Sequence, residues 1–222
     1  MMQKRAEITG EALLHAAATV FARVGYADAR LSTITKRAQV SKGALYDHYG
    51  SKADLAHAVI EAGNTRFQRA CRPFLTSRTP AFEALIGISA LLVDPAVNDA
   101  SVRATFRLLT DIPNHPAADT TLYTTWLSDY RTLAHRALVE GDLRDDPDTV
   151  GQLLVDTLIG VRLLAAATDH LDDLPARLIT AWDRLLPGLV DPTKLDYFHE
   201  HVRRQLAVVV DRDTAPPHPL TA

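Results

Sequence analysis

The sequence has a single cysteine, Cys71, among its 222 residues. One cysteine cannot form a disulfide within the chain, so no disulfide framework is expected. Such a chain suits a reducing compartment, and we expect the protein to be cytoplasmic. The thiol is expected to act as a small buried hydrophobe rather than as a reactive group.

The signatures of catalysis and of metal binding are also missing. We find no glycine-rich phosphate loop, no nucleophile elbow and no cysteine–histidine pairing, so neither enzymatic activity nor a cofactor is predicted. The nine histidines are scattered along the chain. His199 and His201 stand two residues apart on an expected helix, where their side chains point in different directions. No metal site is predicted.

Apolar runs of the length needed to cross a membrane are absent. The stretch from Leu85 to Val93 reaches about half the length of a membrane span. The residues from Met1 to Glu7 are polar, and no apolar signal region follows them. We therefore expect no membrane partner.

Strand-like alternation and Asn-Gly hairpin turns are absent too, which excludes the common all-β architectures. Proline does not occur before Pro73, and the later prolines separate segments of helical periodicity. We therefore predict an all-α protein in which the prolines mark helix boundaries. The predicted helices cover residues 9–24, 32–38, 41–49, 53–72, 81–94, 99–112, 118–140, 148–170, 175–187 and 193–208.

Charge divides the chain into two unlike parts. Residues 1–52 hold eight Lys and Arg against four acidic residues, whereas the remainder holds 16 basic and 23 acidic residues. A basic end suits contact with phosphates, although chance segregation on solvated surfaces gives the same pattern. We place a DNA-binding domain at residues 1–52, a ligand-binding and dimerisation domain at residues 53–213, and a disordered tail at residues 214–222.

The segment from Leu31 to Lys52 carries the strongest functional signal. Its apolar residues can form the shared core of two helices that cross at a sharp turn, which leaves the start of the second helix exposed. Gly43 removes a side chain where DNA must approach closely, and Lys42 can reach a phosphate or a guanine edge. The alternative is a three-helix core cluster without a nucleic acid partner. The DNA-contacting residues that this pattern predicts are Ser41, Lys42, Gly43, Tyr46, His48 and Lys52.

Residues 9–60 contain several linked motifs at fixed spacing, which are more specific than a lone helix-turn-helix pattern. They include Val20-Phe21…Gly25-Tyr26 and then Ala38-Gln-Val-Ser-Lys-Gly-Ala-Leu-Tyr46…His48-Tyr49…Ser51-Lys52. In these motifs the sequence resembles the TetR family of transcriptional repressors. The resemblance implies a helical dimer that reads a palindromic operator. Carried over residue by residue, it implies DNA contacts from Thr33, Lys42, Tyr46, His48 and Lys52.

Three residues depart from the pattern of that family. Gln39 stands where the family usually has glycine in the turn, and a left-handed Gln there costs roughly 1 kcal/mol. Gly10 replaces the usual arginine near the start of the first helix, which removes a phosphate contact. Asp47 puts a negative charge beside the expected phosphate contacts. Operator sequence and affinity therefore stay open.

Aromatic and polar residues from three predicted helices, 99–112, 118–140 and 148–170, are expected to face one another. Trp126 offers a flat surface, and Tyr130 offers a hydroxyl. An apolar cavity between helices with a few convergent polar groups suits a small molecule, whereas the alternative is that the aromatics simply fill a core. The predicted ligand-binding residues are Phe106, Trp126, Tyr130, Asp156, Thr157, Gly160 and Val161.

Within the TetR family, the segments 102–111, 155–161 and 173–187, together with Trp126, resemble the γ-butyrolactone-type receptors of streptomycetes. The resemblance implies a repressor that senses a diffusible autoregulator of butyrolactone, butenolide or furan type and controls antibiotic production. It also implies that Trp126 stacks on the ligand and that Thr157 bonds a lactone carbonyl or carboxylate. Three alternatives stay open: a repressor sensing an unrelated drug or fatty-acyl ligand, a receptor without ligand response, and a helical scaffold without DNA activity.

The predicted helices 148–170 and 175–187 are expected to form a dimer interface. Small residues on the first permit close packing, and the second carries an apolar face. A two-fold dimer places two recognition helices about one turn of DNA apart, which calls for a palindromic site. The alternative is that this face packs only within its own subunit. The predicted interface residues are Gly160, Ala165, Leu178, Trp182 and Leu185.

Overall fold

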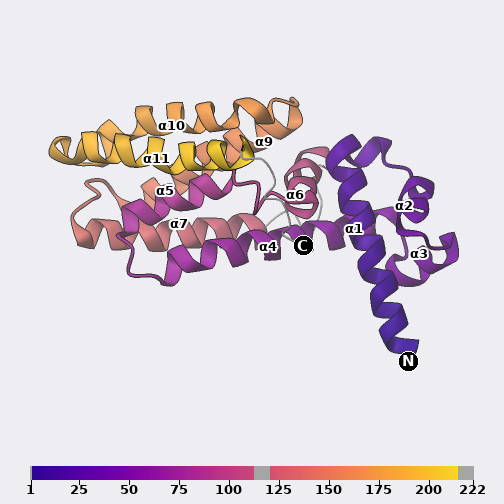
Figure 1. The fold of residues 1–222 in the computed structure, drawn as a ribbon. Helices are drawn as coiled ribbons and strands as arrows, with labels where there is room; N and C mark the ends of the chain where they lie inside the picture. The colour runs from indigo at the N-terminus through magenta and orange to yellow at the C-terminus, as the bar shows by residue number, and fades with distance from the viewer. Residues whose placement is uncertain (1, 113–120, 215–222) are drawn as a thin grey trace, which may run out of the picture.

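In the computed structural model, which describes residues 2–112 and 121–214, every regular element is a helix. Figure 1 shows a small head formed by the N-terminal helices and a longer body formed by the helices that follow. The all-α prediction is therefore confirmed. Residues 118–120 of one predicted helix and 215–222 of the predicted tail lie outside the described residues.

The head consists of α1 (Met2–Asp28), α2 (Leu31–Ala38) and α3 (Lys42–Tyr49). Within α1 the helical conformation is interrupted at Gly25, whose φ of 75° and ψ of −176° are not helical, so two helical segments meet there at a kink. A Cβ atom at this position would collide with the carboxylate of Asp111. Both the positive φ and the close approach therefore require glycine.

The helix α4 (Lys52–Thr76) leaves the head and runs along the body (Figure 1). It begins at a capping pair, because the Ser51 hydroxyl accepts the backbone N–H of Asp54 at 3.1 Å. It packs against α1 near the head and against α6 (Ala100–Asp111) farther on. The buried apolar residues of head and body form one continuous core.

The remaining helices form the body around α4 and α6. Figure 1 shows α10 and α11 side by side along one edge, with α5 between them and the pair formed by α4 and α7. Their bounds are α5 (Ala81–Leu91), α7 (Thr121–Glu140), α8 (Pro147–Leu154), α9 (Gly160–Ala167), α10 (Leu174–Leu189) and α11 (Leu195–Thr214), with short 3₁₀ turns at Leu171–Asp173 and Pro192–Lys194.

The helix predicted over residues 148–170 is divided in the structure. A π-helical turn, Val155–Ile159, stands between α8 and α9, and it shifts the faces that α9 presents. By length and composition the stretch Pro147–Ala167 could cross a membrane, but half of its apolar window is buried inside the protein. A core helix of a globular protein meets the same criteria.

Two prolines lie inside helices, so the prediction that every proline marks a boundary is wrong. Pro73 lies in α4 and Pro187 lies in α10. Each is in the last turn, where the missing N–H interrupts little of the helix that remains. The prediction holds at Pro147, where Asp146 caps α8 by accepting the Thr149 backbone N–H at 2.8 Å.

Candidate DNA interface and ligand site

The helices α2 and α3 form a helix-turn-helix with a small buried core. Ile34 and Leu45 are fully buried between the head helices. The turn between them depends on Gln39, whose φ of 56° and ψ of 39° place it in the left-handed region. Its N–H donates to Lys36 O at 3.3 Å, and Val40 N–H donates to Thr35 O at 3.1 Å. The turn thus keeps the geometry that favours glycine, although Gln occupies it.

The start of α3 is exposed, as the sequence predicts. Ser41, Lys42, Gly43, Tyr46 and His48 are all exposed, and so is the departing residue Asp47. Lys42 and Tyr46 share one face, because the ammonium of Lys42 lies 5.8 Å from the centroid of the Tyr46 ring. The Ser41 hydroxyl accepts the backbone N–H of Ala44 at 3.1 Å, so this side chain caps the helix.

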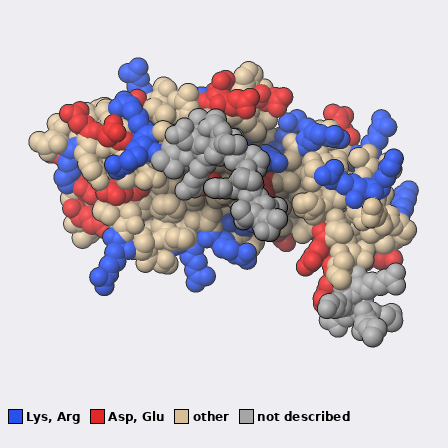
Figure 2. Space-filling view, in the orientation of Figure 1, with Lys and Arg blue, Asp and Glu red and all other residues tan. Residues whose placement is uncertain are grey.

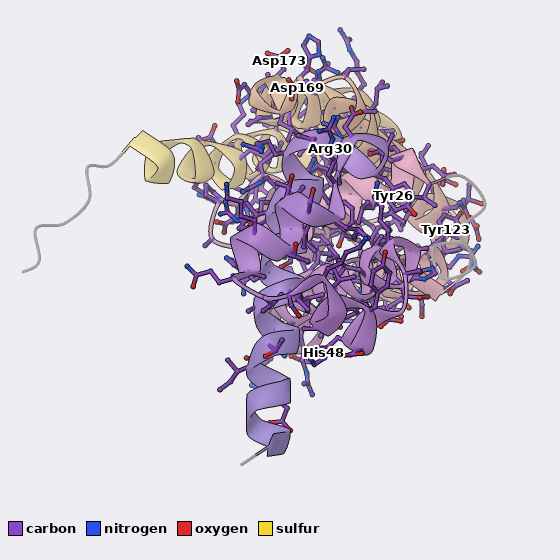
Figure 3. The ribbon with its side chains drawn as sticks, turned by 90° about the vertical axis from the view of Figure 1, so that its right-hand side faces the viewer. Tyr26, Arg30, His48, Tyr123, Asp169 and Asp173 are labelled. Atoms are coloured by element: carbon purple, nitrogen blue, oxygen red, sulfur yellow. The ribbon has the colours of Figure 1, made fainter. Side chains whose placement is uncertain are left out.

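Gly10 allows α1 and α3 to approach closely. The Tyr49 hydroxyl donates to the Gly10 carbonyl at 3.0 Å. A Cβ atom at Gly10 would stand 3.3 Å from Nδ1 of His48. Figure 3 looks onto the head and shows His48 at its lower edge, beside α1. The glycine that departs from the family pattern therefore has a packing role here.

Basic side chains surround the helix-turn-helix. Figure 2 shows Lys and Arg side chains gathered over the head on the face in view. Thr33, a predicted DNA contact, is exposed and lines a surface hollow of about 570 Å³ together with Arg23 and Arg30. Neither arginine is among the predicted DNA contacts, although both belong to the basic residues of the N-terminal part of the chain.

Lys52 is held by the end of α1 rather than standing free. Its ammonium donates to the Ala27 carbonyl at 3.3 Å and lies 4.6 Å from the centroid of the Tyr26 ring. Burial lowers the pKa of Lys52, while the nearby carboxylate of Asp28 acts in the opposite direction. A phosphate contact from Lys52 stays a prediction, and it requires the ammonium to share or leave these contacts.

The body contains a buried aromatic cluster formed by Phe67, Phe106 and Trp126. Phe106 and Trp126 stack with ring centroids 5.8 Å apart and an interplanar angle of 23°. Phe67 meets both rings edge-on, at 5.8 Å from Phe106 and 6.4 Å from Trp126. The rings come from α4, α6 and α7, so the helix that enters the head also forms part of this cluster.

Polar groups adjoin the cluster at Gln68, Asp129 and Tyr130. With the Gln68 amide oriented to satisfy both neighbours, its oxygen accepts the Trp126 indole N–H at 3.2 Å and its nitrogen donates to Asp129 at 3.0 Å. Burial raises the pKa of Asp129. The Tyr130 hydroxyl is buried and has no hydrogen-bond partner among the described residues, and burial raises its pKa strongly. Burial also raises the pKa of the Cys71 thiol to about 12, which fits the expected inert hydrophobe.

The structure gathers Phe106, Trp126 and Tyr130 but leaves the other predicted ligand residues nearer the surface. Asp156 is exposed, and its carboxylate accepts from Gln152 at 3.0 Å. Thr157, Gly160 and Val161 are half-buried. Val161 lines a groove of about 440 Å³ between α9 and α10. Phe67 and Gln68 are not among the predicted ligand-binding residues, because nothing in the local sequence marks which face of a long helix meets the aromatic residues of two others.

The predicted dimer residues divide in the same way. Ala165, Leu178 and Trp182 are fully buried within the single chain, and the Trp182 indole donates to the Ser89 hydroxyl at 2.9 Å. They pack in their own subunit, where α10 lies against α11 and α9 and the Trp182 ring reaches Phe82 of α5, so the single chain leaves no exposed surface of these three side chains for a partner. Gly160 and Leu185 are half-buried. The exposed side of α9 and α10 instead presents the groove lined by Val161, Leu164, Asp173, Ala176, Arg177 and Thr180.

Known proteins resemble this chain both in the head and over most of its length. Residues 13–59 match the family described as "Bacterial regulatory proteins, tetR family". The chain is 25% identical over 213 residues to the "A-factor receptor protein" of Streptomyces griseus, covering 92% of this chain and 72% of that protein.

Solved structures resemble the whole chain. A γ-butyrolactone receptor (ArpA-like protein) is 29% identical with a TM-score of 0.76, covering 92% of this chain and 99% of its own. CprB of Streptomyces coelicolor, described as a TetR family protein in complex with its biological operator sequence, is 28% identical with a TM-score of 0.69, covering 95% and 98%. The similarity to these solved structures therefore covers both the head and the body.

Proposed function

We propose that this chain is a dimeric repressor of the tetR family of bacterial regulatory proteins and that it binds a palindromic operator. A small autoregulator of butyrolactone, butenolide or furan type releases it from DNA when it binds in the body. The observation that carries the proposal is the exposed face of α3, where Lys42, Tyr46 and His48 project from a basic head. Such a face suits a major groove. The protein acts in the cytoplasm, where the chromosome lies.

The ligand part of the proposal is supported by the aromatic cluster and its unpaired polar groups. Phe106 and Trp126 offer apolar surface, and Tyr130 offers a buried hydroxyl without a partner. A buried hydroxyl that lacks a hydrogen bond is unfavourable unless a ligand supplies one. The similarity to the A-factor receptor and to a γ-butyrolactone receptor favours an autoregulator as that ligand.

Two helices connect the ligand site with the head. α4 carries Phe67 in its middle and begins beside the helix-turn-helix. α6 carries Phe106, and at its C-terminal end Asp111 accepts the Tyr26 backbone N–H of α1 at 2.7 Å. A ligand that moves either helix changes the spacing of the two heads in a dimer. Release from DNA then requires a ligand that favours the other conformation by about 1–3 kcal/mol or more.

The domain division that we propose follows from this connection. Residues 1–52 form the DNA-binding part, and residues from 53 onward form the part that binds ligand and a second subunit. The partner subunit is proposed to contact the outer side of α9 and α10, around Leu164 and Ala176, because the inner side is already occupied.

A gel shift tests the proposal. The full-length protein is mixed with the DNA upstream of its own gene, and synthetic γ-butyrolactones, butenolides and alkylfurans are added to the shifted complex. We expect a specific shift that at least one of these compounds reverses. A specific shift that only drugs or fatty-acyl compounds reverse would favour a sensor of another ligand. No specific shift at low salt would contradict a DNA-binding function and favour a helical scaffold.

A further inference from the structure

Arg162 in α9 carries a buried guanidinium that has no ionic partner among the residues the structure describes. The residue is 2% exposed. Its Nη2 donates to Asn98 Oδ1 at 3.3 Å, and its Cζ lies 4.7 Å from the centroid of the Phe106 ring. Within residues 2–112 and 121–214, its Nε and Nη1 have no hydrogen-bond partner. Several N–H donors of one cation therefore remain unused inside the body.

Other arginines with an unbonded Nε are different. Arg107 and Arg131 also lack a hydrogen bond at Nε. Each nevertheless has a carboxylate within ion-pair distance, with Arg107 at 3.9 Å from Asp111 and Arg131 at 3.5 Å from Asp148. Over the described part of the chain, no such carboxylate approaches Arg162.

The cation is unfavourable where it stands. Burial of an unpaired charge costs more than one hydrogen bond to a neutral amide and one aromatic face return. Burial, together with repulsion by Arg103, lowers the pKa of Arg162 to about 10. Arg162 therefore stays charged at neutral pH, and an anion beside it would be strongly favoured.

The guanidinium is also held in position by the loop before α6. The Asn98 side chain is fixed because its Nδ2 donates to Leu91 O at 2.8 Å and to Asp94 O at 2.9 Å. Its Oδ1 is therefore directed at Arg162. The next residue, Asp99, caps α6 and pairs with Arg66 of α4 at 2.9 Å. An anion bound by Arg162 would therefore lie close to Asn98, which directly precedes the residue that caps α6 and links it to α4.

Arg162 belongs to the wall of the aromatic cluster. The ring of Phe106, over which it lies, is the ring that stacks on Trp126. Tyr130 adds a hydroxyl that has no partner. Apolar surface beside unused hydrogen-bond donors is complementary to a small molecule that has an apolar body and an acceptor-rich, negatively charged group.

We propose that the effector is a small amphiphilic carboxylate whose anionic group pairs with Nε and Nη1 of Arg162 while its apolar part lies against Phe106 and Trp126. This inference rests on the proposed function and narrows it. Among the autoregulator types, it selects compounds that carry a free carboxylate, such as alkylfuran carboxylic acids, over neutral lactones.

Isothermal titration calorimetry of the full-length dimer tests the inference. The probes are a 2-alkylfuran-3-carboxylic acid, its methyl ester and a neutral 2-alkanoyl-γ-butyrolactone of equal chain length. We expect the acid to bind the unmodified protein at least about tenfold more tightly than the ester, because a charge-assisted pair is lost in the ester. In Arg162→Gln that preference disappears, with ester affinity changed less than about twofold, and Arg162→Lys retains part of it.

Two controls separate a ligand role from a structural one. Arg144→Gln removes an exposed cation that has no contact with Arg162 or Asn98, and we expect it to leave the acid preference unchanged. Arg162→Met keeps the volume and removes the buried charge, and we expect it to melt at the same temperature as the unmodified protein or about 2–4 °C higher. A fall in melting temperature of that size or more would show that Arg162 stabilises the fold, and it would overturn the inference.

Each of the remaining outcomes of these experiments supports or overturns the inference. Equal binding of acid and ester to the unmodified protein, or no binding of the acid at millimolar concentration, overturns the inference. A neutral lactone that releases DNA equally from the unmodified protein and from Arg162→Gln overturns it while leaving the proposed function intact. Binding of the acid with loss of preference in Arg162→Gln, but without any release of DNA, supports the inference and contradicts the proposed function.

Discussion

The head and the body place their functional side chains in opposite environments. In the head, Lys42, Tyr46 and His48 stand exposed on a short helix, and the buried residues beneath them only hold that helix in place. In the body, Phe106 and Trp126 are part of the continuous core. The head can therefore change what it contacts without changing its fold. In the body, the groups proposed to bind ligand also determine stability.

The comparison extends to polar groups. The polar residues of α3 face solvent, where an unpaired group costs little. Tyr130 and Arg162 are buried with donors unused, where each such group costs free energy. A body with these residues is less stable than one with an apolar core, and it gains stability when a complementary ligand binds.

The largest expected effect is a loss of folding stability caused by a substitution in the core of the body. Phe106→Ala removes a ring that contacts Phe67, Trp126 and Arg162. We expect the free energy of unfolding to fall by about 3–5 kcal/mol, as measured by chemical denaturation. Tyr46→Ala, which removes an exposed ring from the head, should change it by less than about 0.5 kcal/mol. A loss for Phe106→Ala as small as for Tyr46→Ala would break the comparison.

A second substitution in the body, at the proposed dimer interface, should weaken operator binding without altering any residue of the head. Leu164 is 58% exposed on α9, at the proposed interface. We expect Leu164→Glu to weaken dimerisation by about 2–4 kcal/mol, as measured by analytical ultracentrifugation, and to abolish tight operator binding. Arg144→Glu, at an exposed position elsewhere on the body, is the control. A dimer that persists in Leu164→Glu would place the interface elsewhere.

In the head itself, Lys42→Ala should weaken operator binding by about 1–3 kcal/mol and reduce its salt dependence by about one unit of slope. The melting temperature should not change, because the Lys42 side chain is exposed. Fluorescence anisotropy at several salt concentrations measures both quantities. An unchanged slope would mean that Lys42 makes no phosphate contact, and an unfolded variant would contradict its surface role.

The smallest expected effect tests the turn between α2 and α3. Gln39 holds a left-handed conformation, so Gln39→Gly should stabilise the head by about 1 kcal/mol. Thermal unfolding measures this change. Gln39→Ala keeps the strain of a side chain at positive φ and is the matched control, with no gain expected. Equal effects of the two substitutions would mean that the turn conformation is not what limits stability there.

The head was predictable from the sequence because its signals are local. The helix-turn-helix lies within about twenty consecutive residues, and the spacing from Ile34 to Leu45 specifies its core. The exposure of Lys42, Tyr46 and His48 follows from that spacing. The sequence did not indicate that the Lys52 ammonium lies over the Tyr26 ring, because that contact joins the ends of two helices.

The body was predictable only in part, because its site is assembled from distant helices. Helical periodicity marked Phe106 and Trp126 as inward-facing, but it could not tell which face of α4 meets them or that Arg162 turns inward. A charged residue in an apolar helix is normally assigned to the surface. Likewise, Leu178 and Trp182 form an apolar face that suits either a partner or α5, and only the fold decides between them.

The π-helical turn at Val155–Ile159 determines which residues of α9 face the aromatic cluster. The turn holds about one residue more than a regular α-helix would, so a regular α-helix of the same length would rotate everything after it by about 100°. Arg162 would then swing away from Phe106, and a neighbouring aliphatic side chain would take its place. The π-helical turn thus places Arg162, rather than an aliphatic neighbour, against the Phe106 ring.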